Sequence, residues 1–335
     1  MLFLVGLGGA GCRVIELFYR KGVLGSLISR ISASGDEPVR GVAIDTSDAL
    51  EKLISIPIKN MVLIGKHRTK GHGAGSDITL GNKILTEEYE LAMNVLTKAG
   101  FKKADVIFLI AGLGGGTGTG GFPVLAEKIK EIYRIPVIGV YFLPSRGEGA
   151  LYSKNAKDGF SEAVKAADGV IILDNNALTS MGEVITNAYQ ALDEAVFNFL
   201  SSVKPSTVFK LVNGKTSSVA SMEVKAEPTA LKDLIRDLLR NHLYIRLGKT
   251  FESLFLIVYG DRRKIYGQGL AEDWIKEKFG AKLTYNYRRP LNSKVIRCDG
   301  IITGMKGLEK RLAVEVQKRE VASELQSLLE DINPI

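Results

Sequence analysis

The chain has 335 residues, of which 45% are hydrophobic and 24% are charged. These proportions are typical of soluble globular proteins and the length corresponds to about two domains, so a disordered chain and a small disulfide-stapled scaffold are both excluded. The formal net charge of +8 is concentrated in one region, because Lys232–Arg297 contains 15 Lys and Arg residues against 7 Asp and Glu residues.

Neither membrane insertion nor secretion is expected from this sequence. No apolar run reaches the roughly 18–20 residues that a membrane-spanning helix needs. The apolar N-terminus lacks a basic leader, and the two cysteines, Cys12 and Cys298, are too few for a disulfide framework. We therefore expect a cytoplasmic protein without a transmembrane segment.

Short apolar runs recur through the first 180 residues, and most are apolar on successive residues. Such runs are typical of parallel strands that helices cover on both faces. A helix is predicted over Asn82–Ala99, with Gly100 as its stop. Residues 1–180 are therefore predicted to form a doubly wound, Rossmann-like α/β domain, which binds ligands at the carboxyl ends of its strands. The predicted strands are Leu2–Val5, Val39–Asp45, Met61–Ile64, Asp105–Ala111, Ile135–Phe142 and Gly169–Asp174.

The segment Met181–Val203 is predicted to be a long central helix. Apolar residues cover more than one of its faces, which indicates burial between two bodies. We assign residues 181–204 to this helix and residues 205–335 to a smaller α/β domain. Its expected elements are helices at Ala230–Asn241, Glu272–Phe279 and Gly307–Leu329, and strands at Leu254–Tyr259, Lys282–Tyr287 and Lys294–Thr303.

The first of two glycine clusters, Gly6–Gly11, lies between the first predicted strand and a helix. Glycines at such a turn let backbone N–H groups approach a phosphate at a helix N-terminus, where the helix dipole favours anions. The spacing matches G-x-G-x-x-G, which by itself indicates only a nucleotide. A dinucleotide fold would need an acid about 20 residues further on, whereas the first acid near a strand end, Asp45, lies 34 residues after Gly11.

The second cluster, Gly112–Gly121, follows the fourth predicted strand and precedes another helix. Its core reads Gly-Gly-Gly-Thr-Gly-Thr-Gly, a far more specific string than the first cluster. Each Thr adds a hydroxyl to a run of backbone N–H donors, which suits the oxygens of a di- or triphosphate. Two such loops on parallel strands would face the same crevice, so we predict that they hold one polyphosphate between them.

These loops resemble the glycine loops of the tubulin/FtsZ superfamily, with Gly114–Gly120 similar to its signature loop. The resemblance covers the first 200 residues in order and implies GTP or GDP as the bound nucleotide, with Mg²⁺ at the terminal phosphates and Asp45 as its candidate ligand. It implies phosphate contacts from four loops, of which the third senses the γ-phosphate. The residues are Gly8, Gly9, Ala10, Gly11 and Cys12; Asp45 and Thr46; Gly73, Ala74 and Gly75; and Gly114, Gly115, Gly116, Thr117, Gly118 and Thr119.

The same resemblance assigns contacts to the nucleoside. Glu148 lies where the family has a ribose-binding glutamate, and Asn175 matches an asparagine that contacts guanine or ribose. Tyr189 matches the aromatic residue that stacks on guanine, and Asp193 occupies the base-reading position, which is usually Asn. Because a carboxylate accepts hydrogen bonds from both N1–H and the exocyclic amine of guanine, selectivity for GTP over ATP is expected to survive.

Catalysis is predicted to differ from that of the family. The resemblance implies that the next subunit inserts acidic residues, after its central helix, which position the attacking water. An alignment without gaps places Asn213, Lys215 and Ser218 at these positions, and no Asp or Glu occurs from Ala195 through Met222. Losing a positioned base typically costs about 10²–10⁴-fold in rate. We therefore expect slow hydrolysis, or hydrolysis only against a different partner subunit.

The predicted function is that of a GTP-binding cytoskeletal protein that polymerises head to tail, with itself or with a paralogue, in cell shape or division. The altered acidic loop and the missing tail peptide favour an atypical branch similar to the archaeal CetZ proteins. A membrane adaptor would need a surface other than a C-terminal tail, and nucleic acid is not an expected partner. Two alternatives stay open: a non-polymerising GTP-binding regulator of a filament-forming paralogue, and an NAD(P)-dependent oxidoreductase that uses the first glycine loop.

Overall fold

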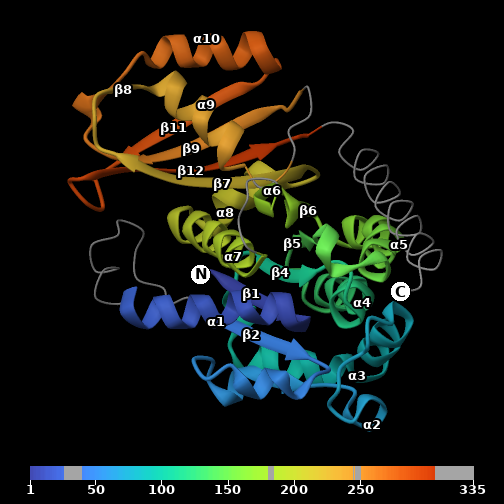
Figure 1. The fold of residues 1–335 in the computed structure, drawn as a ribbon. Helices are drawn as coiled ribbons and strands as arrows, with labels where there is room; N and C mark the ends of the chain where they lie inside the picture. Colours follow the sequence, from blue (N-terminus) through green and yellow to red (C-terminus); the bar gives the residue numbers. More distant parts are fainter. Residues whose placement is uncertain (26–39, 180–184, 244, 246–249, 306–335) are drawn as a thin grey trace, which may run out of the picture. The chain divides into compact units, whose positions relative to one another are not determined.

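A computed structural model of the protein describes residues 1–25, 40–179, 185–243, 245 and 250–305. The chain forms two compact units (Figure 1), of which the first contains Met1–Val170 and the second begins at Ile171. In the described part of the chain, no helix is long and apolar enough to cross a membrane. The α/β fold class is confirmed by the elements of both units, whereas the expected domain boundaries at residues 180 and 204 stay a prediction.

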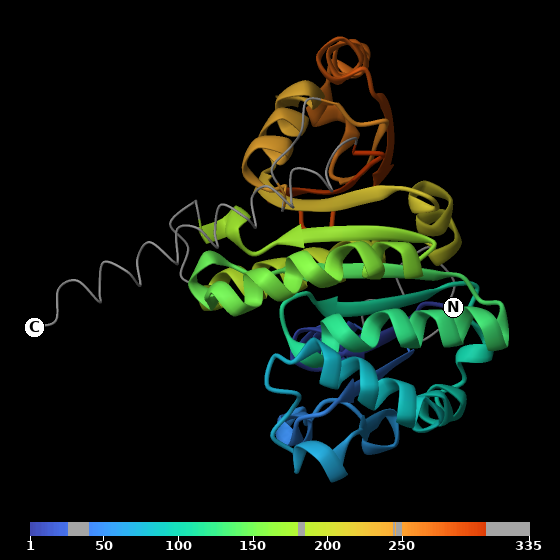
Figure 2. The ribbon, with the colours of Figure 1, turned by 90° about the vertical axis from the view of Figure 1, so that its right-hand side faces the viewer.

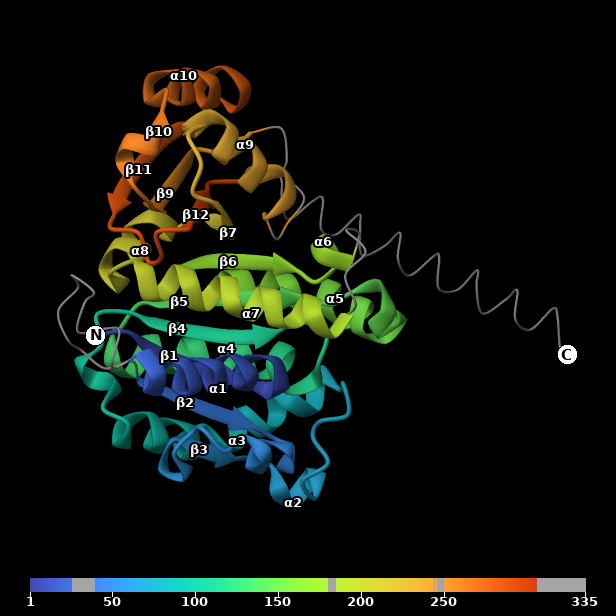
Figure 3. The same cartoon turned by 60° about the vertical axis from the view of Figure 1, so that its left-hand side comes forward.

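Parallel strands form the sheet of the first unit, in the order β5-β4-β1-β2-β3. The first strand is central and later strands are added on both of its sides, as in a doubly wound sheet. Figure 3 shows these strands pointing the same way, so their carboxyl ends share one edge. The strands are β1 (Phe3–Leu7), β2 (Arg40–Asp45), β3 (Met61–Leu63), β4 (Ile107–Gly112) and β5 (Val137–Leu143).

The strands predicted for the first unit are all present, with ends shifted by at most two residues. Every residue of β1 and of β5 is buried, which confirms that the continuous apolar runs mark strands covered on both faces. The sixth predicted strand is β6 (Gly169–Asp174), whose residues are also all buried.

Helices cover both faces of this sheet. Helix α1 packs on one face, whereas α3, α4 and α5 lie on the other (Figures 1 and 2). The predicted helix Asn82–Ala99 begins four residues earlier than expected, at Ile78, because the Asp77 carboxylate caps it by accepting from the N–H of Leu80 at 3.0 Å. The helices of this unit are α1 (Gly8–Gly25), α2 (Lys66–Thr69), α3 (Ile78–Lys98), α4 (Gly116–Tyr133) and α5 (Ala150–Ala166), with 3₁₀ turns at Asp48–Lys52, Ile58–Asn60, Phe101–Lys103 and Arg146–Glu148.

The first turns of α3 and α4 touch backbone to backbone, and glycines make this possible. A Cβ on Gly120 would overlap the carbonyl oxygen of Ile78, and a Cβ on Gly81 would overlap the carbonyl oxygen of Gly116. Helix α5 is held to the sheet by Tyr141, a fully buried residue of β5. The hydroxyl of Tyr141 donates to the carbonyl of Ala163 on α5 at 2.6 Å. Helix α4, which follows the signature glycine loop, is therefore packed closely against α3, and its other neighbour, α5, is held to β5.

The second unit contains a mixed sheet of strand order β11-β9-β12-β7, in which β12 is antiparallel to β7 and β9, and β11 is parallel to β9. Helix α7 packs on β7 and β12, and α9 packs on β7 and α10. The strands are β7 (Thr216–Lys225), β9 (Ser253–Tyr259), β11 (Lys282–Arg288) and β12 (Val295–Thr303), with a short pair of β8 (Thr229–Ala230) and β10 (Ile265–Tyr266). The helices are α6 (Asn176–Thr179), α7 (Ile185–Ser202), α8 (Pro205–Val212), α9 (Leu231–Asn241) and α10 (Gln268–Phe279), with a 3₁₀ turn at Arg262–Lys264.

A buried polar network holds the end of the central helix α7 to this sheet. Asp299 on β12 is fully buried and forms a two-point ion pair with Arg297, with N–O distances of 2.7 and 3.1 Å. Its carboxylate also accepts from the hydroxyl of Ser202, the last residue of α7, at 3.1 Å, and from that of Ser221 at 2.8 Å. Because a buried charge is tolerated only when it is paired and hydrogen-bonded, these partners fix the register between α7 and β12.

The predicted helices and strands of residues 205–303 are present, whereas α8, β7 and the short pair of β8 and β10 were not predicted. Residues 181–184, at the expected start of the central helix, and the expected last helix, Gly307–Leu329, lie outside the described residues.

Candidate functional site

The first glycine loop lies at the carboxyl end of β1, where α1 begins at Gly8. Gly8 has a φ of +72°, a left-handed conformation that favours glycine. A Cβ on Gly11 would overlap the carbonyl oxygen of Ile110, so this turn lies directly on the backbone of β4. Gly9 differs from both, because a Cβ at this exposed position would meet no atom within 4 Å. The N-terminus of α1 therefore opens onto free space.

The side chain of Cys12 points into the protein rather than towards this space. It is 1% exposed, and its Sγ lies 3.5 Å from the carbonyl oxygen of Ile44 and 3.7 Å from that of Gly6. Burial, and then the charge of Asp45, raise the pKa of this thiol well above its usual value. A contact from Cys12 to a ligand would therefore come from its backbone N–H.

The signature loop has the same construction at the end of β4. Gly114 has a φ of +129°, and Gly115 is the N-cap of α4 without a side-chain cap. No acidic residue lies in the first turn of α4, and a Cβ on Gly115 would meet no atom within 4 Å. An uncapped helix N-terminus beside open space is a site for an anion, since its N–H groups lack partners within the helix.

The two threonine hydroxyls of the signature loop brace the loop itself. Thr119 Oγ1 accepts from the N–H of Gly114 at 2.7 Å. Thr117 Oγ1 lies 2.6 Å from Thr46 Oγ1, which joins the signature loop to the end of β2. Both threonines are buried. In this arrangement the backbone N–H groups, more than the hydroxyls, are the donors available to a phosphate.

Four loops predicted to contact phosphate meet at this edge of the sheet. The loop after β2 reaches the signature loop through Thr46, and the Gly73–Gly75 loop reaches it where a Cβ on Gly116 would lie 2.9 Å from the Cβ of Ala74. A Cβ on Gly8 would lie 3.2 Å from the N of Gly118, so the first loop touches it too. The structure thus brings the predicted phosphate loops of the first unit together.

Asp45 is a buried carboxylate at the end of β2, directly before Thr46. It is 6% exposed, and its Oδ1 accepts from the N–H of Thr46 at 2.7 Å. Burial raises its pKa to about 6, against the lowering effect of hydrogen bonds from Thr46, Ser47 and Thr117. The described residues contain no group of three His, Cys, Asp or Glu side chains that could hold a metal ion. A lone carboxylate fits Mg²⁺ bound mainly through phosphates, which is how Mg²⁺ usually binds.

The shifted pKa of Asp45 predicts a pH dependence of stability in the nucleotide-free protein. Because the folded pKa of about 6 lies above the ordinary value of 3.8, the folded state binds the proton more tightly. The stabilisation from this group is therefore full below pH 4 and is lost as the pH rises through 6. Relative to Asp45→Asn, we expect the wild-type free energy of unfolding to fall by about 2 kcal/mol between pH 4 and pH 7. Urea unfolding of both proteins across this pH range measures the difference in the free energy of unfolding. If the two proteins show the same pH dependence, the prediction is wrong.

Glu148 lies in the 3₁₀ turn that follows β5. Its Oε1 accepts from the N–H of Ser145 at 2.6 Å, as part of a capping box that closes this turn. The carboxylate therefore has a structural partner in its own turn, and the predicted contact to ribose stays a prediction.

The predicted nucleoside contacts Asn175, Tyr189 and Asp193 belong to the second unit. Asn175, 5% exposed, follows the buried strand β6. Asp193 is 7% exposed and Tyr189 is half-buried, and the two lie one turn apart on α7. A carboxylate and an aromatic ring at this spacing share one face of a helix, so together they could accept hydrogen bonds from a base and stack on it.

The residues assigned to the acidic loop lie one helix beyond the end of α7. The connection directly after α7 is Val203–Lys204, and Asn213 and Lys215 follow α8 instead. Lys215 Nζ forms an ion pair with Glu252 at 2.9 Å, and Ser218 is fully buried on β7. The segment Ala195–Met222 contains no Asp or Glu that could position the attacking water. A catalytic role for Asn213, Lys215 and Ser218 stays a prediction.

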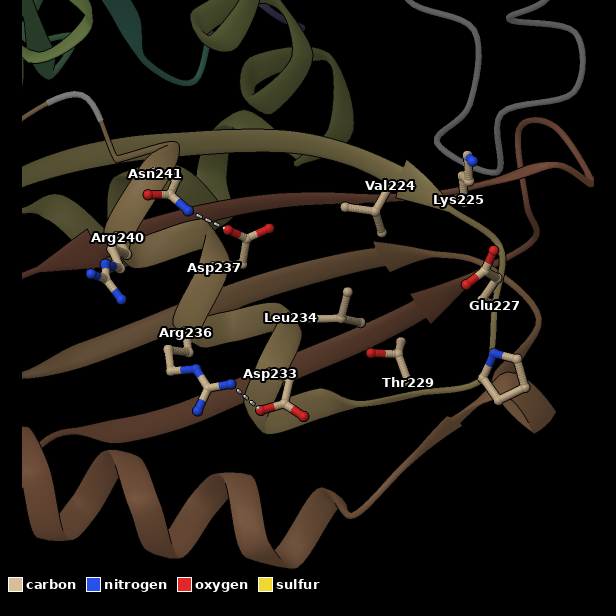
Figure 4. Close-up of a pocket in the computed structure, with 11 residues that line it drawn as sticks. Val224, Lys225, Glu227, Thr229, Asp233, Leu234, Arg236, Asp237, Arg240 and Asn241 are labelled. Carbon is tan, nitrogen blue, oxygen red and sulfur yellow. Dashed lines mark hydrogen bonds and ion pairs between the residues drawn. The ribbon is translucent and has the colours of Figure 1, made fainter. Parts of the chain in front are cut away.

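A hollow of about 690 Å³ lies elsewhere in the second unit, between α9, the end of β7 and β8 (Figure 4). Two of its carboxylates pair with neighbours on α9, Asp233 with Arg236 and Asp237 with Asn241. None of the predicted site residues lines it, and we assign it no role. The lining residues are Val224, Lys225, Glu227, Pro228, Thr229, Asp233, Leu234, Arg236, Asp237, Arg240 and Asn241.

Comparison with known proteins identifies relatives that match part of this chain. CetZ1 of Haloferax volcanii is 34% identical over 203 residues, which are 59% of this chain and 48% of that protein. CetZ of Pyrococcus furiosus is 30% identical over 253 residues, 71% of this chain and 65% of that protein. Cell division protein FtsZ 1 of Pyrococcus abyssi is 34% identical over 205 residues, 60% and 49% of the two chains. The chain thus spans about half the length of the first curated relatives that it matches.

Solved structures agree with these relatives. The GDP-bound monomer of CetZ1 from Haloferax volcanii superposes with a TM-score of 0.79 and 26% identity over 97% of this chain and 100% of that chain. The GTPγS-bound protofilament of CetZ2 from the same organism gives a TM-score of 0.78 and 25% identity over the same shares. The family model described as "Tubulin/FtsZ family, GTPase domain" matches residues 1–183. These residues include the four glycine and threonine loops of the first unit, so the resemblance is confirmed and the chain belongs to the tubulin/FtsZ family.

Proposed function

We propose that this chain binds GTP and GDP and assembles head to tail into filaments. The observation that carries the proposal is the convergence of four loops beside the N-termini of α1 and α4, where Gly9 and Gly115 face free space and α4 has no side-chain cap. A glycine that faces such a space lets backbone N–H groups approach phosphate oxygens closely. In this proposal the diphosphate and triphosphate groups lie against these two helices.

Guanine as the base is supported by the comparison structures, which are CetZ1 bound to GDP and CetZ2 bound to GTPγS. Both are similar to this chain over 97% of its length. Tyr189 would stack on the base, Asp193 would accept from its N1–H and amine, and Glu148 and Asn175 would contact the nucleoside. When bound, Mg²⁺ would neutralise charge on the terminal phosphates, and Asp45 is the residue proposed to hold it.

Head-to-tail assembly is supported by the CetZ2 structure, which is a protofilament. A heterologous interface repeated along one direction produces an open filament, and a nucleotide buried at that interface makes assembly depend on its binding. The proposed partner is a second copy of this chain or a paralogue, and the proposed place is the cytoplasm. By similarity to CetZ and FtsZ proteins, the proposed role is in cell shape or division, on the CetZ-like branch.

Hydrolysis is proposed to be slow, or to need a different partner subunit. The connection after α7 contains Val203 and Lys204, and the turn after α8 contains Lys215, which Glu252 neutralises. A lysine cannot act as a carboxylate base, and losing a positioned base typically costs about 10²–10⁴-fold in rate. GTP bound at the interface would therefore persist in the assembled state.

Asp193 is expected to decide which base is accepted. Asp193→Ala should weaken binding of GTPγS by about 10²-fold and leave the weak binding of an ATP analogue unchanged, because only guanine has donors at both N1 and the exocyclic position. Asp193→Asn keeps one acceptor and should lose far less. Gln190→Ala, at an exposed position on the same helix, is the control. Equal loss for both nucleotides in calorimetric titrations would contradict the assignment.

The experiment that tests the proposed function combines light scattering with phosphate release. GTP is added to the purified protein alone, and then to a mixture with a filament-forming paralogue. We expect scattering to rise with the protein alone while phosphate release stays close to that of a control without protein. Scattering only in the mixture would identify a non-polymerising regulator. Rapid phosphate release by the protein alone would overturn the proposed slow hydrolysis.

A further inference from the structure

Helix α5 packs against the signature loop. A Cβ on Gly159 would overlap the Cγ2 atom of Thr119, and a Cβ on Gly114 would lie 2.9 Å from the ring of Tyr152. Between these positions, Asn155 also faces the loop. Residues 152, 155 and 159 share one face of a helix, so this face of α5 contacts the signature loop.

Asn155 joins two loops of the site with one side chain. It is 6% exposed, and its Nδ2 donates to the carbonyl of Ser76 at 2.5 Å and to the carbonyl of Gly114 at 2.9 Å. An amide nitrogen carries two N–H donors, so both are used. The acceptors belong to the end of the Gly73–Ser76 loop and to the signature loop, which are far apart in the sequence.

The Gly73–Ser76 loop has an unusual backbone, which is closed on itself by a hydrogen bond from the N–H of Asp77 to the carbonyl of Ala74 at 2.9 Å. Gly73, Gly75 and Ser76 have φ values of +82°, +57° and +61°, and Ser76 is a side-chain-bearing residue in a region that such residues rarely adopt. At its start, the loop is tied by the N–H of Gly73, which donates to the carbonyl of Thr46 at 3.2 Å. The amide of Asn155 ties its end.

We propose that Asn155 is a positioning residue that sets the Gly73–Ser76 loop against the signature loop, so that the preference for a nucleoside triphosphate over a diphosphate depends on it. Asn155 does not touch the nucleotide in this proposal. The inference rests on the proposed function, in which the Gly73–Ser76 loop contacts only the γ-phosphate. Without Asn155 the triphosphate must order the loop on binding, which costs affinity, whereas the diphosphate does not use the loop.

The test is the affinity ratio of GTPγS to GDP, measured by calorimetry for wild type, Asn155→Ala and Asn155→Ser. We expect Asn155→Ala to weaken GTPγS binding about tenfold, the size of one to two lost hydrogen bonds, and to change GDP binding by less than about twofold. Asn155→Ser keeps one donor and should fall between Asn155→Ala and wild type. Lys154→Ala, at the exposed neighbouring position on α5, should match wild type. Equal weakening for both nucleotides, or no weakening, overturns the proposal, because a purely structural role would not change the ratio.

A second measurement needs no variant and keeps the proposal testable if both substitutions prevent folding. Hydrogen exchange of the nucleotide-free wild type should show peptides over residues 73–77 and 114–116 opening as one unit, with equal free energies of opening. Independent opening would overturn the role of Asn155. Failure of the wild type to bind either nucleotide would instead overturn the proposed function, so the two failures are distinguishable.

Discussion

Gly120→Ala is expected to destabilise the protein by about 3 kcal/mol or more, a larger effect than most single substitutions have. The Cβ would overlap the carbonyl oxygen of Ile78 and lie 2.7 Å from the N of Asn82. Both atoms belong to the backbone of α3, so no side-chain rotation can make room, and the first turns of α3 and α4 must separate. Overpacking of this kind typically costs 1–3 kcal/mol and sometimes more. Urea unfolding of the nucleotide-free protein measures the loss.

The control for this substitution is Gly269→Ala on α10, where a Cβ would meet no atom within 4 Å. Alanine favours a helix over glycine by up to about 1 kcal/mol, so this variant should be as stable as wild type or slightly more stable. Equal stability of Gly120→Ala and wild type would show that the close approach of α3 and α4 is not needed.

Gly115→Ala is expected to fold like wild type and to lose nucleotide binding by about 100-fold. A Cβ at this position meets no protein atom within 4 Å, and the φ of −77° suits any residue, so stability should change little. The free space that it enters lies at the uncapped N-terminus of α4, where the account places phosphate. A methyl group there prevents the close approach of N–H donors to phosphate oxygens, and about 100-fold corresponds to about 2.7 kcal/mol of lost binding.

Calorimetric titration with GDP measures the loss of binding, and a urea unfolding curve measures the stability of the variant. Unchanged GDP affinity in a folded Gly115→Ala protein would contradict the proposed position of the phosphates. The two substitutions in one loop therefore separate two roles of glycine, with Gly120 needed for the packing of the fold and Gly115 for the ligand.

Much of the fold could be predicted because its strands are continuous apolar runs. The exceptions have physical causes. Strand β7 begins with Thr216, Ser217 and Ser218, of which both serines are fully buried, so its buried face carries hydroxyls where an apolar pattern is expected. Helix α8 has only 8 residues, too few for a helical period to show.

The phosphate loops could be predicted because a glycine-rich string shows, from neighbouring residues alone, where the backbone must turn tightly or approach a ligand closely. The roles of side chains around them could not, because these depend on distant partners. Cys12 is turned inward by carbonyls of β1 and β2, and Thr117 is paired with Thr46. Asn155 gives no signal in the sequence, because its two partners precede it by 79 and 41 residues.

The most direct test of the central claim is a calorimetric titration of the purified, nucleotide-free protein with GDP, with NADH titrated in parallel. We expect that one GDP binds per chain, that Gly115→Ala loses this binding while remaining folded, and that NADH does not bind. Binding of NADH in place of GDP, or no binding of either GDP or GTPγS by the folded protein, would contradict the claim that these loops hold one guanine nucleotide.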